Sequence, residues 1–289
     1  MLLHVLGTAA GGGVPQWNCT CPGCAGARRH PEWRRRHASV AVRTGDRCFI
    51  VNATPDLADQ VELCAPPGPG PRETPLAGVL LTDAELDHTL GLARLREAGS
   101  MEVFATAAVT HALRDRLRLD AVLSPYTRMT WHDLPVDRCV DVGGSLTVQA
   151  VRVSGKRPRY AADCSPSGAW SVALRLSDGV RTTVYAPALA DWPPELEEVL
   201  GQADCVIVDG TFWDDDEPRR TGISERTATG MGHLPITETA GRLARLPASH
   251  RLYTHLNNTN PLIDPAAPEH GRLAAMGIEV ATEGAVVEL

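Results

Sequence analysis

Short apolar runs recur along the whole chain, and their length and β-branched content are typical of β-strands. We expect strands at residues 2–6, 39–42, 48–51, 79–81, 146–153, 171–176, 182–185, 205–208, 251–253, 278–280 and 285–289. Apolar positions at helical spacing predict helices at residues 56–63, 88–97, 107–117, 193–200, 235–246 and 267–275. Some strands come in hairpin-like pairs and others alternate with helices. This mixture predicts an α/β architecture in which two mixed sheets lie between helices.

Three long polar stretches interrupt this pattern and are predicted to be loops: residues 65–76, 155–168 and 214–232. Long loops in compact domains more often cover or bind something than serve only as connections. No stretch reads as a linker between domains, the Pro/Gly-rich loop at 65–76 lies too early to divide two domains, and 289 residues fit one large domain. We therefore expect a single domain over residues 1–289.

Composition and charge exclude several classes of protein. With 43% hydrophobic and 22% charged residues, the chain can bury a core and should be ordered and soluble. A net charge of −7 does not favour a nucleic-acid substrate, and no apolar run is long enough to span a bilayer. Scattered cysteines are typical of small buried side chains in a reducing compartment, which predicts a cytoplasmic protein. They are Cys48, Cys64, Cys139, Cys164 and Cys205.

Three further cysteines stand close together in the segment WNCTCPGC. Cys19, Cys21 and Cys24 form a C-x-C-x-x-C pattern that can wrap one tetrahedral Zn²⁺. The alternative is a set of free or redox-active thiols, but so tight a cluster is poorly explained by core packing. We expect one tightly held structural Zn²⁺ in a loop at about residues 15–30. The fourth ligand stays open among His30, His233 and Asn258.

A second group of polar side chains follows predicted strands. The adjacent pair Asp87 and His88 comes after a short apolar run, and His255 follows another. Asp209 has the same placement, and His233 stands just before a predicted helix. Each has an ordinary alternative: Asp87 could cap a helix, Asp209 could belong to an Asp-Gly turn, and a lone histidine could only form a hydrogen bond. Several such residues at strand ends of one α/β chain nevertheless favour a common site.

The order of these segments resembles that of the metallo-β-lactamase superfamily. The resemblance covers nearly the whole chain and rests on the segments LGTAAGGG, DHTLGL, YAPAL, DGTFWDDDE, MGHL and HLNNTNP. It implies a four-layer αββα sandwich of the α/β class. Within the superfamily, GGGVPQWNCTCPGC and HLNNTNP are similar to a branch that acts in the biosynthesis of pyrroloquinoline quinone (PQQ).

Hydrolases of this superfamily carry the motif His-x-His-x-Asp-His, from which this chain departs. Asp83 and Glu85 stand where the first two histidines would be, and Ala188 replaces the metal-bridging aspartate. No histidine occurs in residues 151–163, where another ligand would be expected. The first of the two metal positions has therefore lost its ligands. Two-metal hydrolysis needs both ions, about 3.5–4 Å apart, so hydrolysis is not expected.

The second metal position keeps Asp87, His88 and His255. Two histidines and one carboxylate with open positions suit a non-haem Fe(II) that activates O₂. The resemblance then implies a hydroxylase that acts on the tyrosine ring of a PQQ precursor derived from Glu and Tyr. Asp209 and His233 would form its catalytic acid–base pair, as in related nucleases.

A predicted loop offers Arg157, Arg159 and Tyr160 to the carboxylates of such a substrate, although ordinary solvation explains these side chains as well. Two other functions stay open. One is a zinc-dependent hydrolase that uses Asp83 or Glu85 to hold a second metal, and the other is a non-catalytic carrier of PQQ or its precursor. The expected partners are the small precursor and other proteins of the PQQ pathway, not nucleic acid.

Overall fold

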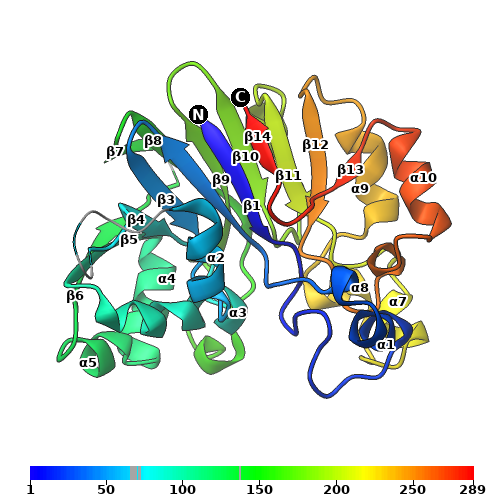
Figure 1. The fold of residues 1–289 in the computed structure, drawn as a ribbon, viewed down its shortest axis with the longest axis horizontal. Coiled ribbons are helices and arrows are strands. Elements are labelled where there is room, and N and C mark those ends of the chain that lie inside the picture. Colours follow the sequence, from blue (N-terminus) through cyan, green and yellow to red (C-terminus); the bar gives the residue numbers. More distant parts are fainter. Residues whose placement is uncertain (66–69, 71–72, 137) are drawn as a thin grey trace.

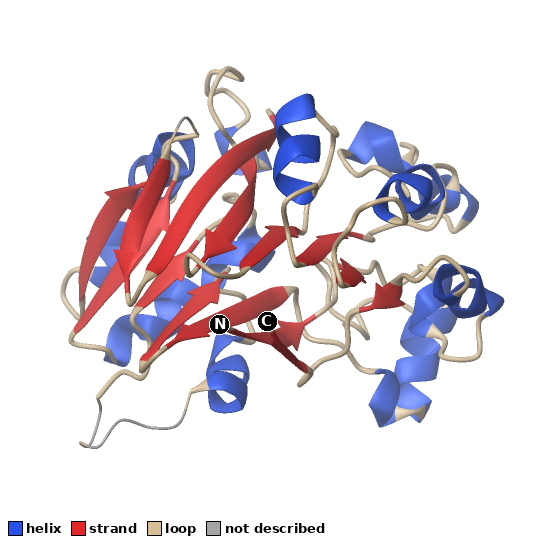
Figure 2. Cartoon of the chain, turned by 90° about the horizontal axis from the view of Figure 1, so that it is seen from above, coloured by secondary structure: helices blue, strands red, loops and turns tan. Residues whose placement is uncertain are grey.

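The computed structural model describes residues 1–65, 70, 73–136 and 138–289. Two seven-stranded sheets face each other, and helices cover the outer face of each, which gives four layers in the order αββα (Figures 1 and 2). The predicted α/β sandwich is therefore confirmed. Half of the predicted loop at 65–76 lies outside the described residues.

Each sheet mixes parallel and antiparallel neighbours. The first has the order β14-β1-β2-β3-β4-β5-β6 and the second the order β13-β12-β11-β10-β9-β8-β7. The strands of the first sheet are β1 (Leu2–Gly7), β2 (Ser39–Thr44), β3 (Arg47–Val51), β4 (Gly78–Leu80), β5 (Ser100–Ala105), β6 (Arg128–Asp133) and β14 (Val286–Glu288). Those of the second are β7 (Cys139–Gly143), β8 (Leu146–Ser154), β9 (Ser171–Ser177), β10 (Thr182–Ala186), β11 (Cys205–Asp209), β12 (His250–Thr254) and β13 (Glu279–Val280).

The helices are short and lie outside the sheets, with α2 and α4 beside the first and α9 and α10 beside the second (Figure 1). The α-helices are α1 (Pro22–Arg29), α2 (Leu57–Cys64), α3 (Leu86–Thr89), α4 (Ala107–His111), α5 (Leu119–Leu123), α6 (Pro194–Leu200), α7 (Glu217–Arg220), α8 (Ala228–Met231), α9 (Ile236–Leu243) and α10 (Pro268–Ala274). Short 3-10 helices occur at Pro31–Trp33, Leu90–Glu97, Arg159–Ala161 and Pro261–Ile263, and a π helix occurs at Ala112–Arg116.

Side chains along the strands alternate between separate cores, because successive residues of a strand point to opposite faces. In β3, Phe49 and Val51 enter the core between the sheets, whereas Ile50 enters the core under the helices of the first sheet. In β11, Ile207 faces the central core and Val208 faces the core under α6 and α9. Both sheets are thus covered on both faces, which explains why their strands form nearly continuous apolar runs.

Three strands, β5, β6 and β7, are not predicted by the apolar pattern. β6 and β7 lie at the edges of their sheets, and the side chains of β6 are all at least partly exposed. An edge strand therefore lacks the apolar run that identifies an inner strand. β5 is an inner strand, but Ser100 and Glu102 interrupt its sequence at its two half-exposed positions.

Two predicted segments differ from the structure. The predicted helix at 88–97 is the short helix α3 followed by a 3-10 helix, and the predicted loop at 214–232 contains α7 and α8. Gly91, in the 3-10 helix, packs against the segment after β3. A Cβ atom on residue 91 would lie 2.1 Å from the Thr54 carbonyl oxygen. Among the described residues, no helix has both the length and the apolar content needed to cross a membrane.

The ends of β4, β11 and β12 position the candidate site. β11 and β12 are parallel, with Asp209 opposite Thr254, so Asp209 and His255 leave neighbouring strands at the same edge. An isolated bridge joins Asp83, just after β4, to Ser171 at the start of β9. This bridge places the end of β4, in the first sheet, next to the start of the inner strand β9, in the second sheet. Ligands of α/β proteins commonly bind at such carboxyl ends of strands.

Glu217, in α7, is a buried carboxylate that links two segments of the chain. Its oxygens accept hydrogen bonds from the Trp213 amide (2.6 Å) and the Thr259 hydroxyl (2.7 Å). Burial raises its pKa from 4.5 to about 7. Because the folded protein holds this proton more tightly than the unfolded chain, stability should fall as pH rises from 4.5 towards 7 and level off above that value.

Glu217→Gln keeps the shape of the side chain and removes its charge. We expect the variant to gain stability relative to the native protein as the pH is raised from about 5 to about 8, by up to about 3 kcal/mol. Urea unfolding of both proteins at several pH values measures the difference. Parallel stability profiles would contradict a buried, titrating Glu217.

Candidate metal centre

Three side chains of metal-ligand type meet at the ends of two strands. Asp87 and His88 lie in α3, after β4, and His255 directly follows β12. Asp87 Oδ2 is 3.4 Å from His255 Nε2 and 3.8 Å from His88 Nε2. One ligand atom of each residue lies within 4.8 Å of the other two. The structure therefore brings the three predicted ligands of the active-site metal together.

Two nitrogen atoms of this group are buried and lack a hydrogen-bond partner. His88 is 1% exposed and His255 is 5% exposed, yet no partner for the Nε2 atom of either occurs among the described residues. Buried polar atoms are nearly always paired, so two unpaired nitrogens beside one carboxylate need an explanation. Imidazole and carboxylate are suitable donors for a divalent ion such as Fe(II) or Zn²⁺. The three residues fit one such ion with open positions.

Asp83 holds the other nitrogen of His88. Its Oδ2 accepts hydrogen bonds from His88 Nδ1 (2.7 Å) and the Thr82 hydroxyl (2.8 Å), and its Oδ1 accepts from the Glu85 amide (2.9 Å). Asp83 stands where the superfamily motif has a histidine, and its carboxylate orients His88 with Nε2 towards Asp87. Burial disfavours the imidazolium, but Asp83 and Asp87 outweigh it and raise the pKa of His88 to about 9.

Thr211 lies between His255 and the predicted acid–base pair. Asp209 Oδ2 and His233 Nδ1 are 2.7 Å apart, and the Thr211 hydroxyl is 2.5 Å from Asp209 Oδ1 and 2.8 Å from His255 Nδ1. One carboxylate oxygen of Asp209 and one ring nitrogen each of His233 and His255 also lie within 4.8 Å of one another. The Thr211 hydroxyl already bonds this cluster together, so it forms a hydrogen-bond network and not a second metal site. Thr211 was not predicted from the sequence, although the DGTF segment places it two residues after Asp209.

The environment of this network keeps its groups in defined charge states. Burial alone would raise the pKa of Asp209, but the His233 imidazole lowers it below its ordinary value. Burial lowers the pKa of His255, which favours the neutral imidazole that a metal ligand requires. The backbone of His255 has a φ of 59°. A non-glycine residue in this left-handed region is strained, and such residues concentrate at functional sites.

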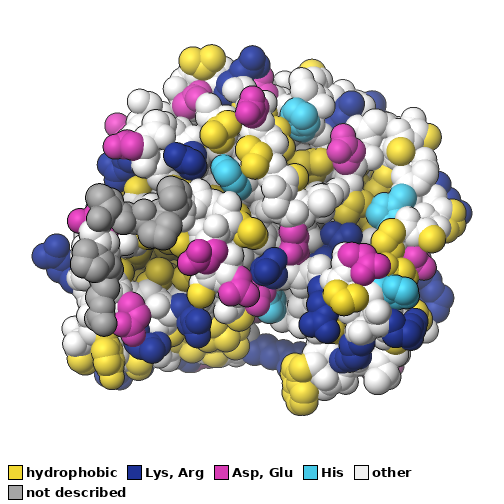
Figure 3. Space-filling model, viewed as in Figure 1, with side chains coloured by type: hydrophobic (Ala, Val, Ile, Leu, Met, Phe, Trp, Pro, Cys, Tyr) yellow, Lys and Arg dark blue, Asp and Glu magenta, His cyan; other side chains and the backbone are white. Residues whose placement is uncertain are grey.

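The candidate site opens into a cavity of about 630 Å³. Figure 3 shows the molecule hollowed at its lower edge, between α3 and the N-terminal segment that leads to α1, with Lys and Arg side chains beside the hollow. The predicted substrate residues Arg157, Arg159 and Tyr160 all line the cavity. Two of these side chains also form hydrogen bonds within the protein. The Tyr160 hydroxyl donates to the Ala84 carbonyl (2.6 Å), and the Arg157 guanidinium donates to the Cys164 carbonyl.

Two further cations line the cavity and were missed by the sequence analysis. They are Lys156, which follows β8, and Arg226, which precedes α8. Lys156 Nζ lies 3.5 Å from His233 Nε2, on the side of the imidazole opposite its hydrogen bond to Asp209. Nothing in the sequence distinguishes these two residues from the other cations of their loops. Only the folding of both loops around the cavity identifies them.

The three clustered cysteines lie in the segment before and inside the first turn of α1. The sulfurs of Cys19, Cys21 and Cys24 are within 4.8 Å of one another. Each sulfur accepts a hydrogen bond from a backbone amide. The Gln16 amide donates to Cys24 Sγ (3.2 Å), the Cys21 amide to Cys19 Sγ (3.4 Å) and the Cys24 amide to Cys21 Sγ (3.4 Å). Burial raises the pKa of Cys24 to about 12 without a metal. A bound cation would be needed to hold all three as thiolates.

Of the three candidates for the fourth zinc ligand, Asn258 contacts the sulfurs. Its side-chain nitrogen is 3.1 Å from Cys19 Sγ and 3.2 Å from Cys21 Sγ. Its backbone carbonyl oxygen is 3.2 Å from Cys21 Sγ. His30 instead stacks on a tryptophan, and His233 belongs to the network at the other site. Asn258 also lies three residues after His255. The cysteine loop is thus docked on the segment that carries a ligand of the candidate active-site metal.

Comparison with known proteins agrees with this arrangement. Residues 47–256 match the β-lactamase superfamily domain. The chain is 40% identical to coenzyme PQQ synthesis protein B of Cupriavidus necator over 99% of both proteins, and 38% identical to that of Azoarcus sp. over 100% of both. The chain belongs to the coenzyme PQQ synthesis protein B family. The crystal structure of Zn(2+)-bound PqqB from Methylobacterium extorquens is similar to it, with a TM-score of 0.91, 30% identity and full coverage of both chains.

The family assignment extends over every segment described above. Because the alignments run the full length of the relatives, they include the cysteine loop, the DHTLGL segment and the HLNNTNP segment. The M. extorquens PqqB structure likewise covers the whole chain. The similarity to the family therefore extends over the whole chain and not over one matching domain alone.

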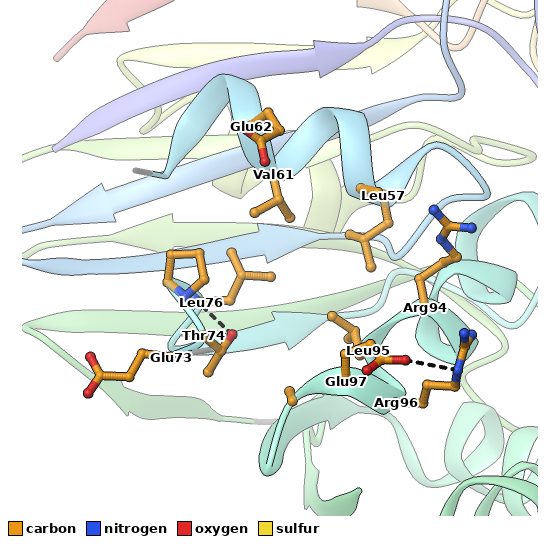
Figure 4. Close-up of a pocket in the computed structure, with 13 residues that line it drawn as sticks. Leu57, Val61, Glu62, Glu73, Thr74, Leu76, Arg94, Leu95, Arg96 and Glu97 are labelled. Carbon is orange, nitrogen blue, oxygen red and sulfur yellow. Dashed lines mark hydrogen bonds and ion pairs between the residues drawn. The ribbon is translucent and has the colours of Figure 1, made fainter. Parts of the chain in front are cut away.

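A second cavity of this family member, of about 600 Å³, lies between α2 and the 3-10 helix Leu90–Glu97 (Figure 4). Leu57 and Val61 of α2 point into it, and Arg96 pairs with its neighbour Glu97 at 3.3 Å. Among the described residues that line it there is no histidine, cysteine or aspartate. Its carboxylates, Glu62, Glu73 and Glu97, are all exposed, and none of the described lining residues puts an imidazole or thiol beside them.

Proposed function

We propose that this member of the PQQ synthesis protein B family is a metal-dependent hydroxylase, with Fe(II) held by Asp87, His88 and His255. Membership of the family supports a role in PQQ biosynthesis. The observation that carries the proposal is the pair of buried, unpartnered Nε2 atoms beside one carboxylate. Two imidazoles and one carboxylate leave open positions at an Fe(II) ion, where such sites activate O₂.

The residues around the site favour one metal over two. Both oxygens of Asp83 already accept hydrogen bonds, and Ala188 offers no donor atom in its side chain. Burial raises the pKa of Glu85, which disfavours the ionised form that a metal ligand would need. Hydrolysis by a pair of ions about 3.5–4 Å apart is therefore poorly supported.

The protein's own side chains would bind the substrate and move its proton. His233 is held at Nδ1 by Asp209, so its Nε2, which faces the cavity beside Lys156, is placed to accept the proton of a phenol. Arg159 and Arg226 line the same cavity and would bind carboxylates. A precursor derived from Glu and Tyr has both kinds of group. When bound, Fe(II) would supply the activation of O₂.

The experiment that tests this function starts with anaerobic protein loaded with Fe(II) and a Glu–Tyr type compound. On addition of ¹⁸O₂, we expect a product with labelled oxygen on the tyrosine ring, seen by mass spectrometry, and none in the anaerobic sample. Cleavage of an ester or phosphodiester without O₂ would instead indicate a hydrolase. Tight binding of the compound or of PQQ without any turnover would indicate a carrier.

We also propose that the protein acts in the cytoplasm, next to other proteins of the PQQ pathway. None of the eight cysteines, all of which lie among the described residues, forms a disulfide, as is usual in reducing compartments. Cell fractionation tests the location. Recovery of the protein with periplasmic markers would contradict it.

A further inference from the structure

The carboxylate of Asp209 determines the direction of every hydrogen bond in its network. Asp209 is fully buried and, as a carboxylate, can only accept. It accepts from the Leu189 amide (2.7 Å), from His233 Nδ1 (2.7 Å), and from both the amide (2.9 Å) and the hydroxyl (2.5 Å) of Thr211. The single hydroxyl proton of Thr211 is therefore directed to Asp209.

This leaves Thr211 Oγ1 as an acceptor towards His255. The oxygen is 2.8 Å from His255 Nδ1, so that nitrogen must carry the proton. His233 Nδ1 is also within 3.1 Å of Thr211, but its proton has the closer acceptor in Asp209. A neutral His255 with its proton on Nδ1 presents the lone pair of Nε2 to the proposed metal position beside Asp87.

We infer that Thr211 is a positioning residue that fixes His255 in the Nδ1–H tautomer and so prepares Nε2 for the metal. Asp209 thereby acts on both histidines: directly on His233 in the acid–base pair, and through Thr211 on the metal ligand. The inference rests on the proposed metal site, but it does not depend on the reaction that occurs there. It is the counterpart of the contact between Asp83 and His88 on the other side of the site.

The competing arrangement shows why the hydroxyl matters. Without Thr211 Oγ1, the acceptor nearest to the ring nitrogens of His255 is Asp87 Oδ2, 3.4 Å from Nε2, so a proton on Nε2 is favoured. That tautomer places a proton where the metal must bind. Binding would then require the proton to move to an Nδ1 atom without an acceptor. Side chains that orient metal-bound histidines typically affect metal affinity by about 10–100-fold.

Thr211→Val tests the inference, because valine has nearly the same shape as threonine and keeps the hydrogen bond from the backbone amide of residue 211 to Asp209. Thr211→Ser restores the hydroxyl. Thr239→Val is the matched control, since Thr239 is equally buried and its hydroxyl bonds Tyr253 instead of a ligand. Zn²⁺ is used as a diamagnetic probe, with the cysteine site already filled, and its binding is measured by competition with a chromophoric chelator.

We expect Zn²⁺ to bind Thr211→Val about 10–100-fold more weakly than the native protein. Thr211→Ser should bind within about threefold of the native protein, on the same scale, and Thr239→Val should be unchanged. In histidine-labelled protein without metal at this site, ¹⁵N NMR should show His255 as the Nδ1–H tautomer in the native protein and in Thr211→Ser. In Thr211→Val it should shift towards Nε2–H. A merely structural role would not move this tautomer.

Two results would overturn the inference. One is an Nε2–H tautomer of His255 in the native protein, which can be measured even if Thr211→Val does not fold. The other is Zn²⁺ affinity in a folded Thr211→Val equal to that of the native protein. Both measurements are made without O₂ or substrate. Failure of the hydroxylation experiment therefore leaves the inference standing, and failure here leaves the proposed reaction to its own test.

Discussion

His88→Ala or His255→Ala should reduce turnover of a Glu–Tyr type compound by more than about 1,000-fold, because groups that act as a unit fail together. Each change removes one of two buried nitrogens that have no other partner. It also leaves the Asp87 carboxylate with a single imidazole, which is too few ligands for a well-held ion. Product formation by anaerobically loaded protein after addition of O₂ measures the effect.

The control for these variants is His111→Ala. His111 is an exposed histidine at the end of α4 that pairs with Asp115, so its loss should leave turnover unchanged. Circular dichroism shows whether each variant folds. Folded His88→Ala or His255→Ala protein that turns over the compound at the native rate would contradict the assignment of the metal ligands.

Cys21→Ser should remove a zinc ion from the cysteine loop and lower the stability of the whole protein. Cys21 is the N-cap of α1, where its sulfur accepts from the Cys24 amide, and serine is also a favourable N-cap. The substitution therefore removes a thiolate without removing the cap. Loss of a structural metal site should cost more than about 4 kcal/mol, or a decrease in Tm on the order of 10 °C.

Cys139→Ser provides the comparison, because Cys139 is exposed in the edge strand β7. It should keep the native zinc content and the native Tm. Elemental analysis and thermal unfolding are measured on the same samples. Native protein that contains no zinc, with Cys19, Cys21 and Cys24 all titratable as free thiols, would reject the zinc site.

The placement of the candidate ligands could be predicted because strand ends follow from apolar patterns. β4, β11 and β12 are buried on both faces, so their sequences are apolar runs whose ends are visible. Polar residues just beyond those ends, such as Asp87, Asp209 and His255, were expected to meet at one edge. The edge strands β6 and β7 carry weak apolar patterns, and their absence from the prediction did not affect the site.

The residues that hold the ligands could not be predicted. Thr211 bonds a histidine 44 positions further along the chain, and Lys156 approaches a histidine 77 positions away. Such contacts depend on how β11, β12 and the loop after β8 pack together, which no local pattern encodes. Asp83 was noticed because it stands where the superfamily motif has a histidine, but its contact with His88 could not be predicted from that departure.

The most direct test of the central claim is the metal content of protein reconstituted anaerobically with Fe(II). The claim is that the chain holds one active-site metal at Asp87, His88 and His255, besides the zinc of the cysteine loop. Elemental analysis should find one zinc and one iron per chain in the native protein, and only the zinc in His255→Ala. Two further metal ions per native chain, or iron retained by His255→Ala, would contradict the account.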